Sequence, residues 1–161
     1  LNLGKIFDRE EKAESLVKEM KDEISRTAGQ ATLTGKHPRG LIIEFMGSDI
    51  SVYGEETLAG DILRRMNGEL LASGQQQISK EQIIEIDPDA IFVILIEGDY
   101  DHPKQKLDML YHEQALRDVR CIREKRVYPL PLYSVYSSGI RTLDGIRYIG
   151  KGLYPDLYKE Q

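Results

Sequence analysis

The strongest feature of the hydrophobic pattern is an unbroken apolar run at residues 90–96. The run is too short to cross a bilayer and is rich in β-branched residues, so it predicts a central parallel strand covered on both faces. A short helix is predicted just before it, because Ser79 and Gln82 have the spacing of a capping box. Pro88 disfavours helical geometry in the preceding residue, and we expect the helix to end there.

The N-terminal segment has the pattern of an amphipathic helix. We expect this helix to open at Asp8 and Glu11, which are spaced like a second capping box, and to end at Gly29. The remaining positions of the segment are mostly charged, which is typical of a helix with one protein-facing side. Its apolar stripe consists of Ala13, Leu16, Val17, Met20 and Ile24.

Strand and helix patterns alternate through the rest of the chain. A strand is predicted at 41–46, and the helix that follows the loop after it should stop at Gly68. A further strand at 126–130 contains prolines, which favours an edge position, and Arg141 opens the last helix. This alternation predicts an α/β fold, a three-layer Rossmann-like domain with a mostly parallel sheet and helices on both faces.

Composition narrows the class of protein. With 161 residues the chain has the length of one domain, and its net charge of −5 argues against a nucleic-acid partner. Neither a GxGxxG nor a Walker-type sequence is present, so a nucleotide site is not indicated. The single cysteine, Cys121, excludes an internal disulfide and has the apolar neighbours of a buried small hydrophobic residue.

Three loops, at 47–53, 97–102 and 132–139, follow the carboxyl ends of predicted strands. Ligands of open α/β sheets bind at that end, so we expect the loops to form one rim. Tyrosine suits a large planar ligand and can supply a phenolate to ferric iron, and arginine can pair with a ligand carboxylate. Packing of the same tyrosines on the domain surface explains them about equally well. The candidate ligand-binding residues are Tyr53, Tyr100, His102, Tyr133, Tyr136 and Arg141.

The acidic loop at 97–102 has two competing interpretations. Glu97, Asp99, Asp101 and His102 are possible cation ligands, but their spacing is not that of an EF-hand, and a solvated loop is favoured. Asp99 and His102 could also act as an acid and a base, although no third catalytic group accompanies them. We therefore expect no metal, no cofactor and no catalytic residue.

The order of five motifs resembles a known family. The stretch "SKEQIIEIDPDAIFVI" resembles the C-terminal lobe of the substrate-binding proteins of ABC importers for iron-siderophores, haem and cobalamin, which are periplasmic binding proteins. "LGKIFDREEKAESLVKEM" resembles the helix that joins the two lobes of that family. "GEETLAGDILRRMNGELL", "ALRDVRCIREKRVYPLP" and "IRTLDGIRYIGKGLYPD" agree with later parts of the lobe in the same order.

The resemblance implies a domain organisation and a function. Residues 1–30 correspond to the linking helix and residues 31–161 to the C-terminal lobe, with the N-terminal lobe absent from this chain. The implied function is capture of an iron-siderophore, haem or corrinoid and its delivery to the membrane permease of an ABC importer. The implied location is extracytoplasmic, either periplasmic or anchored by lipid to the outer face of the cell membrane. The alternative is a self-contained α/β domain, a chelatase-like enzyme or a small-ligand sensor.

Glu81 has two interpretations. A carboxylate in the first turn of a helix favours the helix dipole and otherwise faces water. The resemblance adds a docking role, because a C-lobe glutamate in a serine-x-glutamate stretch meets arginines of the permease in this family, and Ser79-Lys80-Glu81 matches that stretch. The docking role requires Glu81 to be exposed, away from the ligand loops and without an internal cation partner.

Overall fold

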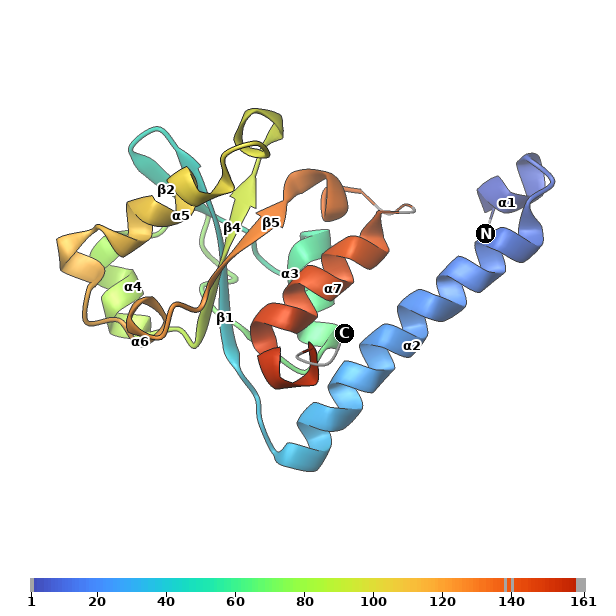
Figure 1. The fold of residues 1–161 in the computed structure, drawn as a ribbon, viewed down its shortest axis with the longest axis horizontal. Coiled ribbons are helices and arrows are strands. Elements are labelled where there is room, and N and C mark those ends of the chain that lie inside the picture. The colour runs from blue at the N-terminus through green and yellow to red at the C-terminus, as the bar shows by residue number, and fades with distance from the viewer. Residues whose placement is uncertain (1, 138, 140, 159–161) are drawn as a thin grey trace.

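The computed structural model describes residues 2–137, 139 and 141–158, which fold around a five-stranded sheet (Figure 1). The strand order is β2-β1-β4-β5, with β3 paired to the start of β1. All pairs are parallel except the β1–β2 hairpin. The mostly parallel sheet is as predicted. The strands are β1 (Arg39–Met46), β2 (Asp49–Val52), β3 (Glu69–Leu70), β4 (Ala90–Leu95) and β5 (Val127–Pro131).

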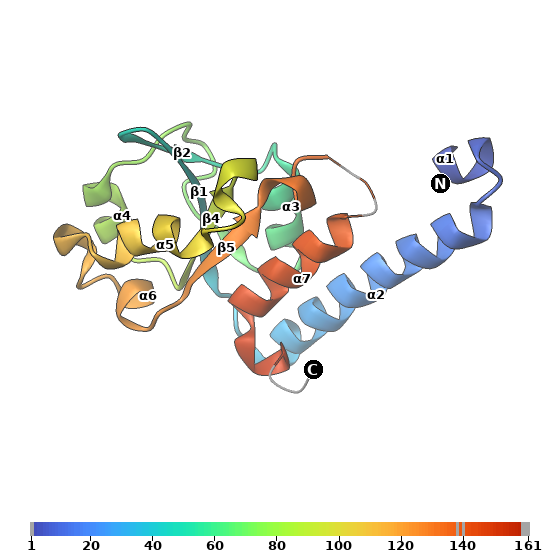
Figure 2. The same ribbon diagram turned by 45° about the horizontal axis from the view of Figure 1, so that its top comes forward.

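Helices cover both faces of this sheet, which confirms the three-layer prediction (Figures 1 and 2). One face is covered by α3 (Leu58–Arg65) and α7 (Thr142–Leu153). The other is covered by α4 (Lys80–Ile86), α5 (Pro103–Tyr111) and α6 (Arg120–Arg123). Outside these layers lie α1 (Asn2–Ile6) and the long α2 (Glu10–Thr34). Short 3-10 turns occur at Glu97–Asp99, Gln114–Leu116, Leu132–Ser134 and Pro155–Tyr158.

The central strand β4 supplies side chains to two separate cores. Ile91 and Val93 point into the core beneath α4, α5 and α6, whereas Phe92 and Ile94 point into the core beneath α3 and α7. All four are at most 2% exposed, and full burial of each such side chain stabilises the fold by roughly 1.5–3 kcal/mol. The predicted strand is therefore confirmed, although Ile96 lies beyond it and is 44% exposed.

The predicted ends of the N-terminal helix are wrong. Asp8 has a positive φ of 52° and lies in a turn, and α2 begins only at Glu10. The helix then continues through Gly29 to Thr34. A glycine inside a helix costs only about 1 kcal/mol relative to alanine, which a long helix tolerates. Gly35, with a φ of 65°, takes the left-handed position that follows the helix.

Two other predicted features also differ. Residues 47–53 are not a loop throughout, because Gly47 (φ 66°) allows a tight turn and β2 pairs back on β1. The helix α3 ends at Arg65 rather than at Gly68, and Asn67 (φ 65°) takes the left-handed conformation after it. In contrast, β5 is an edge strand and Arg141 is the N-cap of α7, as predicted.

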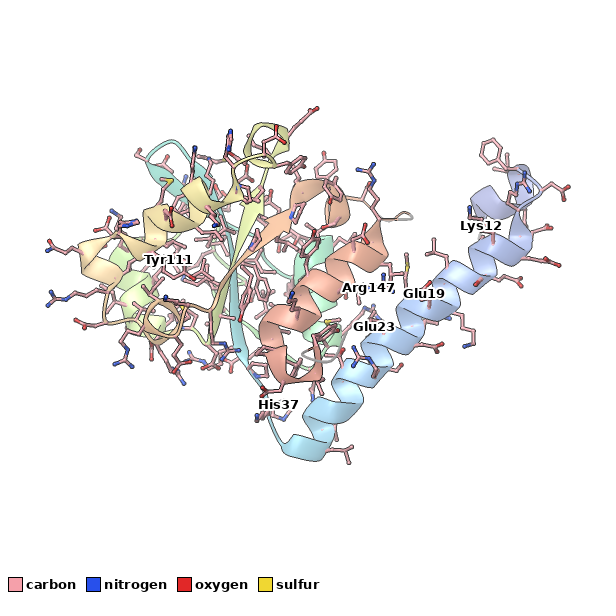
Figure 3. The ribbon with its side chains drawn as sticks, in the orientation of Figure 1. Lys12, Glu19, Glu23, His37, Tyr111 and Arg147 are labelled. Atoms are coloured by element: carbon pink, nitrogen blue, oxygen red, sulfur yellow. The ribbon has the colours of Figure 1, made fainter. Side chains whose placement is uncertain are left out.

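From Glu19 onward, α2 is fastened to the domain by polar contacts (Figure 3). The Tyr158 hydroxyl donates to the Glu23 carboxylate at 2.6 Å, and the Arg26 guanidinium lies 4.8 Å from the centre of the Tyr158 ring. Arg147 of α7 donates to Glu19 at 2.8 Å. Burial raises the pKa of Glu23, but hydrogen bonds from Arg26 and Tyr158 outweigh it, so the net shift is downward. The first turns of α2 extend away from the sheet with α1 (Figures 1 and 2).

None of the described helices combines the length and apolar character needed to cross a membrane.

Gly60 permits close packing of α3, and this gives a first prediction. A Cβ atom at Gly60 would lie 2.1 Å from the backbone oxygen of Gly54, whereas one at Gly74 would meet nothing within 4 Å. We expect Gly60→Ala to lower the free energy of unfolding by about 1–3 kcal/mol. Gly74→Ala should change it by less than about 0.5 kcal/mol. Denaturant unfolding of both variants checks this, and equal stabilities would contradict the packing argument.

Candidate ligand-binding site

The carboxyl ends of β1, β4 and β5 bring three segments to one edge of the sheet (Figure 1). They are the turn of the β1–β2 hairpin, the 3-10 turn Glu97–Asp99 after β4 and the 3-10 turn Leu132–Ser134 after β5. The predicted shared rim is therefore present, with a hairpin in place of the first loop. Tyr53 lies past β2, and its backbone N–H donates to Ile42, so its backbone sits below this edge.

Tyr133 is the centre of the first side-chain group on the rim. Its ring meets that of Tyr100 edge to face, with centroids 5.4 Å apart and an interplanar angle of 83°. The Arg141 guanidinium lies 4.7 Å from the centre of the Tyr133 ring, a cation–π distance. Tyr148 of α7 lies close to Tyr133, and burial together with the electrostatic effect of Tyr133 raises the pKa of Tyr148. The group therefore joins three elements into one aromatic surface.

Tyr53 and Glu44 form a second group. The Tyr53 hydroxyl donates to the Glu44 carboxylate at 2.6 Å, and both residues are half-buried. Burial and the neighbouring carboxylate raise the pKa of Tyr53, so it remains a hydroxyl donor at neutral pH. A phenolate at Tyr53, which ferric iron would require, is thus disfavoured. Tyr136, which is 77% exposed, makes a minor electrostatic contribution to the same pKa shift.

Glu44 was not among the predicted site residues. It is the one charged residue in the otherwise apolar segment 41–46, and this was the available signal. Its partner Tyr53 is nine residues away along the chain and is brought beside it by the hairpin.

His102 and the acidic loop do not assemble into a catalytic or metal site. His102 is exposed at the N-cap of α5, and its side chain caps no backbone group. The Asp99 carboxylate accepts from the backbone N–H of Ile96 at 3.3 Å and pairs with Lys106 at 3.6 Å, so it is engaged away from His102. Within the described residues, no three His, Cys, Asp or Glu side chains lie close enough to hold a metal ion.

Cys121 is buried, as predicted. Burial raises its pKa to about 12, so it is a poor nucleophile at neutral pH.

Glu81 is exposed in the first turn of α4. Its own backbone N–H and the Ser79 side chain lower its pKa, and across the described residues it makes no ion pair. The neighbouring Lys80 pairs with Glu113 instead. Ser48 of the hairpin lines a shallow hollow together with Ser79 and Lys80, so the hairpin turn lies near the start of α4, but Glu81 is not among the residues that line this hollow. A helix that leads into a parallel strand runs antiparallel to that strand, so α4 begins at the carboxyl edge of the sheet.

An open, mostly parallel sheet with its loops gathered at the carboxyl edge belongs to the class of α/β domains that bind ligands at that edge. The family model described as "Periplasmic binding protein" matches residues 1–133, and the chain belongs to this family. The resemblance seen in the sequence is thereby confirmed. The family consists of extracytoplasmic binding proteins rather than enzymes, so the expected location and the expected lack of catalysis are confirmed as well.

Three relatives show the extent of the match. The chain is 26% identical to the uncharacterized ABC transporter substrate-binding lipoprotein YvrC of Bacillus subtilis, over 98% of this chain and 49% of that protein. It is 23% identical to the iron-uptake system-binding protein of the same organism, over 78% of this chain and 42% of that protein. A crystal structure of a periplasmic binding protein from Veillonella parvula superposes with a TM-score of 0.93 at 39% identity, covering 98% of this chain and 50% of that one. The chain thus spans about half the length of these relatives.

The Tyr53–Glu44 hydrogen bond gives a second prediction. Tyr53→Phe removes the donor and leaves a half-buried carboxylate without it, so we expect the free energy of unfolding to fall by about 1–2 kcal/mol at neutral pH. Tyr136→Phe, a matched change at an exposed ring, should cost less than about 0.5 kcal/mol. Chemical denaturation measures both values. Similar losses for the two variants would show that the hydrogen bond does not contribute to stability.

Proposed function

We propose that this chain is the C-terminal lobe, with its linking helix, of a two-lobed solute-binding protein of an ABC importer. The half-length match to relatives and the extension of α2 beyond the sheet support this organisation (Figures 1 and 2). In this proposal residues 1–30 are the linking segment and residues 31–161 are the lobe, and the helix α2 itself ends at Thr34, four residues past that boundary. The polar contacts of Glu19 and Glu23 hold this helix against the lobe.

The proposed activity is capture of an iron-siderophore, haem or corrinoid between the two lobes, followed by delivery to a membrane permease. The observation that carries it is the surface formed by Tyr100, Tyr133 and Arg141 with Tyr136 beside it. Flat aromatic rings bury large organic ligands at low entropic cost, and arginine adds an anchor for a polar group. The similarity to an iron-uptake system-binding protein agrees with an iron-containing ligand. His102, exposed at the end of the same loop, is a peripheral member of the proposed site.

Glu81 is the proposed docking residue for the permease. It is exposed, it belongs to the first turn of a capped helix and it makes no ion pair within the described residues, so its carboxylate is free to meet an arginine. Both hydrogen bonds of the capping box are present and hold this turn in place. Charge-assisted contacts of this kind fix the register of docking more than they add affinity.

The capture role gives a third prediction, made for the two-lobed protein. Replacing both Tyr133 and Tyr136 by alanine should weaken binding of the native ligand by about tenfold or more, because ring contact area is lost. The matched double phenylalanine variant keeps the rings and should retain most of the affinity. Isothermal titration calorimetry measures the ligand affinities of the two double variants. Unchanged affinity of the double alanine variant would rule out the assigned surface.

The docking role gives a fourth prediction. Glu81→Lys should leave folding and ligand affinity nearly unchanged while reducing ligand uptake by the intact transporter, because it places a positive charge against arginine. Glu124→Lys is the control, since Glu124 is an exposed glutamate after α6, at the other end of the sheet. Uptake assays in cells that carry either variant provide the measurement. Normal uptake with Glu81→Lys would exclude the docking role.

A further inference from the structure

The loops of the rim carry negative charge. The segments 47–53, 97–102 and 132–139 contain no lysine or arginine, and their acidic residues are Asp49, Glu97, Asp99 and Asp101. Three cations lie near the rim on neighbouring helices, namely Lys106, which pairs with Asp99 at 3.6 Å, Arg141 over the Tyr133 ring, and Lys80, which lines a hollow with Ser48. Lys80 is paired with Glu113, which is not one of the four acidic residues counted above, so acidic groups of the rim loops remain in excess. A polyanionic ligand would therefore meet an unfavourable potential on this lobe.

Glu44 adds a carboxylate in a defined position to the negative charge of the rim loops. Its Oε2 accepts from Tyr53, whereas its Oε1 has no hydrogen-bond partner among the described residues. No lysine, arginine or histidine in the described part of the chain forms an ion pair with it. A half-buried carboxylate is incompletely hydrated, so a cation or an N–H donor that reaches it gains a charge-assisted hydrogen bond.

The position of Glu44 connects it to the aromatic surface. It lies near the carboxyl end of β1, on the strand next to β4, and Tyr53 holds it in place. Tyr133 follows the carboxyl end of β5, which is two strands from β1 in the sheet, a span of about 10 Å at the usual strand spacing. A ligand of siderophore or corrinoid size that covers Tyr133 would thus come close to the free oxygen of Glu44.

We propose that Glu44 receives an ammonium or amide N–H group of the ligand, and that this lobe selects neutral or cationic chelates over anionic ones. The inference rests on the proposed capture function and narrows its ligand class. It favours hydroxamate-type iron chelates and amide-rich corrinoids. It disfavours ferric catecholates, which carry several negative charges, and haem, which carries two propionates.

The test uses the two-lobed protein and defined probes. Ferrioxamine B and ferrioxamine E share an iron–hydroxamate core, but only the former carries a free ammonium group. We expect ferrioxamine B to bind about tenfold more tightly than ferrioxamine E, the effect of one charge-assisted hydrogen bond. Glu44→Gln should bring this ratio close to one, and added salt should reduce it in the unmodified protein. Glu69→Gln, at the opposite end of the sheet, should leave the ratio unchanged.

Ferric enterobactin, haem and cyanocobalamin complete the panel. Tighter binding of cyanocobalamin than of the two anionic probes, weakened by Glu44→Gln, also supports the inference. Preference for ferric enterobactin or haem, or a ferrioxamine ratio unaffected by Glu44→Gln, would overturn the inference and leave the capture function intact. Failure to bind any of the five probes would overturn the capture function and the inference with it. If Glu44→Gln does not fold, the ratio of the ferrioxamine affinities is measured in the unmodified protein at low and high salt. A ratio that added salt does not reduce would then overturn the inference.

Discussion

Burial of β4 on both of its faces is the constraint on which the rest of the structure depends. Its alternating side chains enter two cores, one beneath α4, α5 and α6 and the other beneath α3 and α7. Neither face can be exposed without losing several buried side chains, each contributing roughly 1.5–3 kcal/mol. Helices must therefore lie on both sides, and the parallel strands β1, β4 and β5 must be joined by crossover connections.

This arrangement also determines where polar chemistry can occur. The middle of the sheet is apolar, so carboxylates and hydroxyls are accommodated near the carboxyl ends of the strands. The Tyr53 hydroxyl donates to Glu44 there at 2.6 Å, and beyond β5 the Arg141 guanidinium lies over the Tyr133 ring. A rigid sheet thus presents an aromatic and acidic surface whose groups are already in position. Preorganisation of this kind lowers the entropic cost of binding a ligand.

The sequence predicted the elements that have strong local signals and missed those decided by context. The apolar run at 90–96 and the capping box at Ser79 were sufficient to locate β4 and α4. Gly29 is not a comparable signal, because a glycine can either end a long helix or lie within it, and tertiary packing determines which of the two occurs. Glu44 was missed as a site residue because its role depends on a hairpin, and that hairpin depends on the backbone conformation of Gly47.

The most direct test of the account is a crystal structure of the two-lobed protein with its transported ligand bound. If the ligand is captured on the tyrosine rim, we expect it to lie between the lobes, to cover the rings of Tyr133 and Tyr136 and to approach Glu44. The chain also has a hollow at the opposite end of the sheet, lined in part by His37, Arg126 and Tyr154 (Figure 3 labels His37). A ligand bound in that hollow, with the tyrosine rim exposed to solvent, would contradict the account.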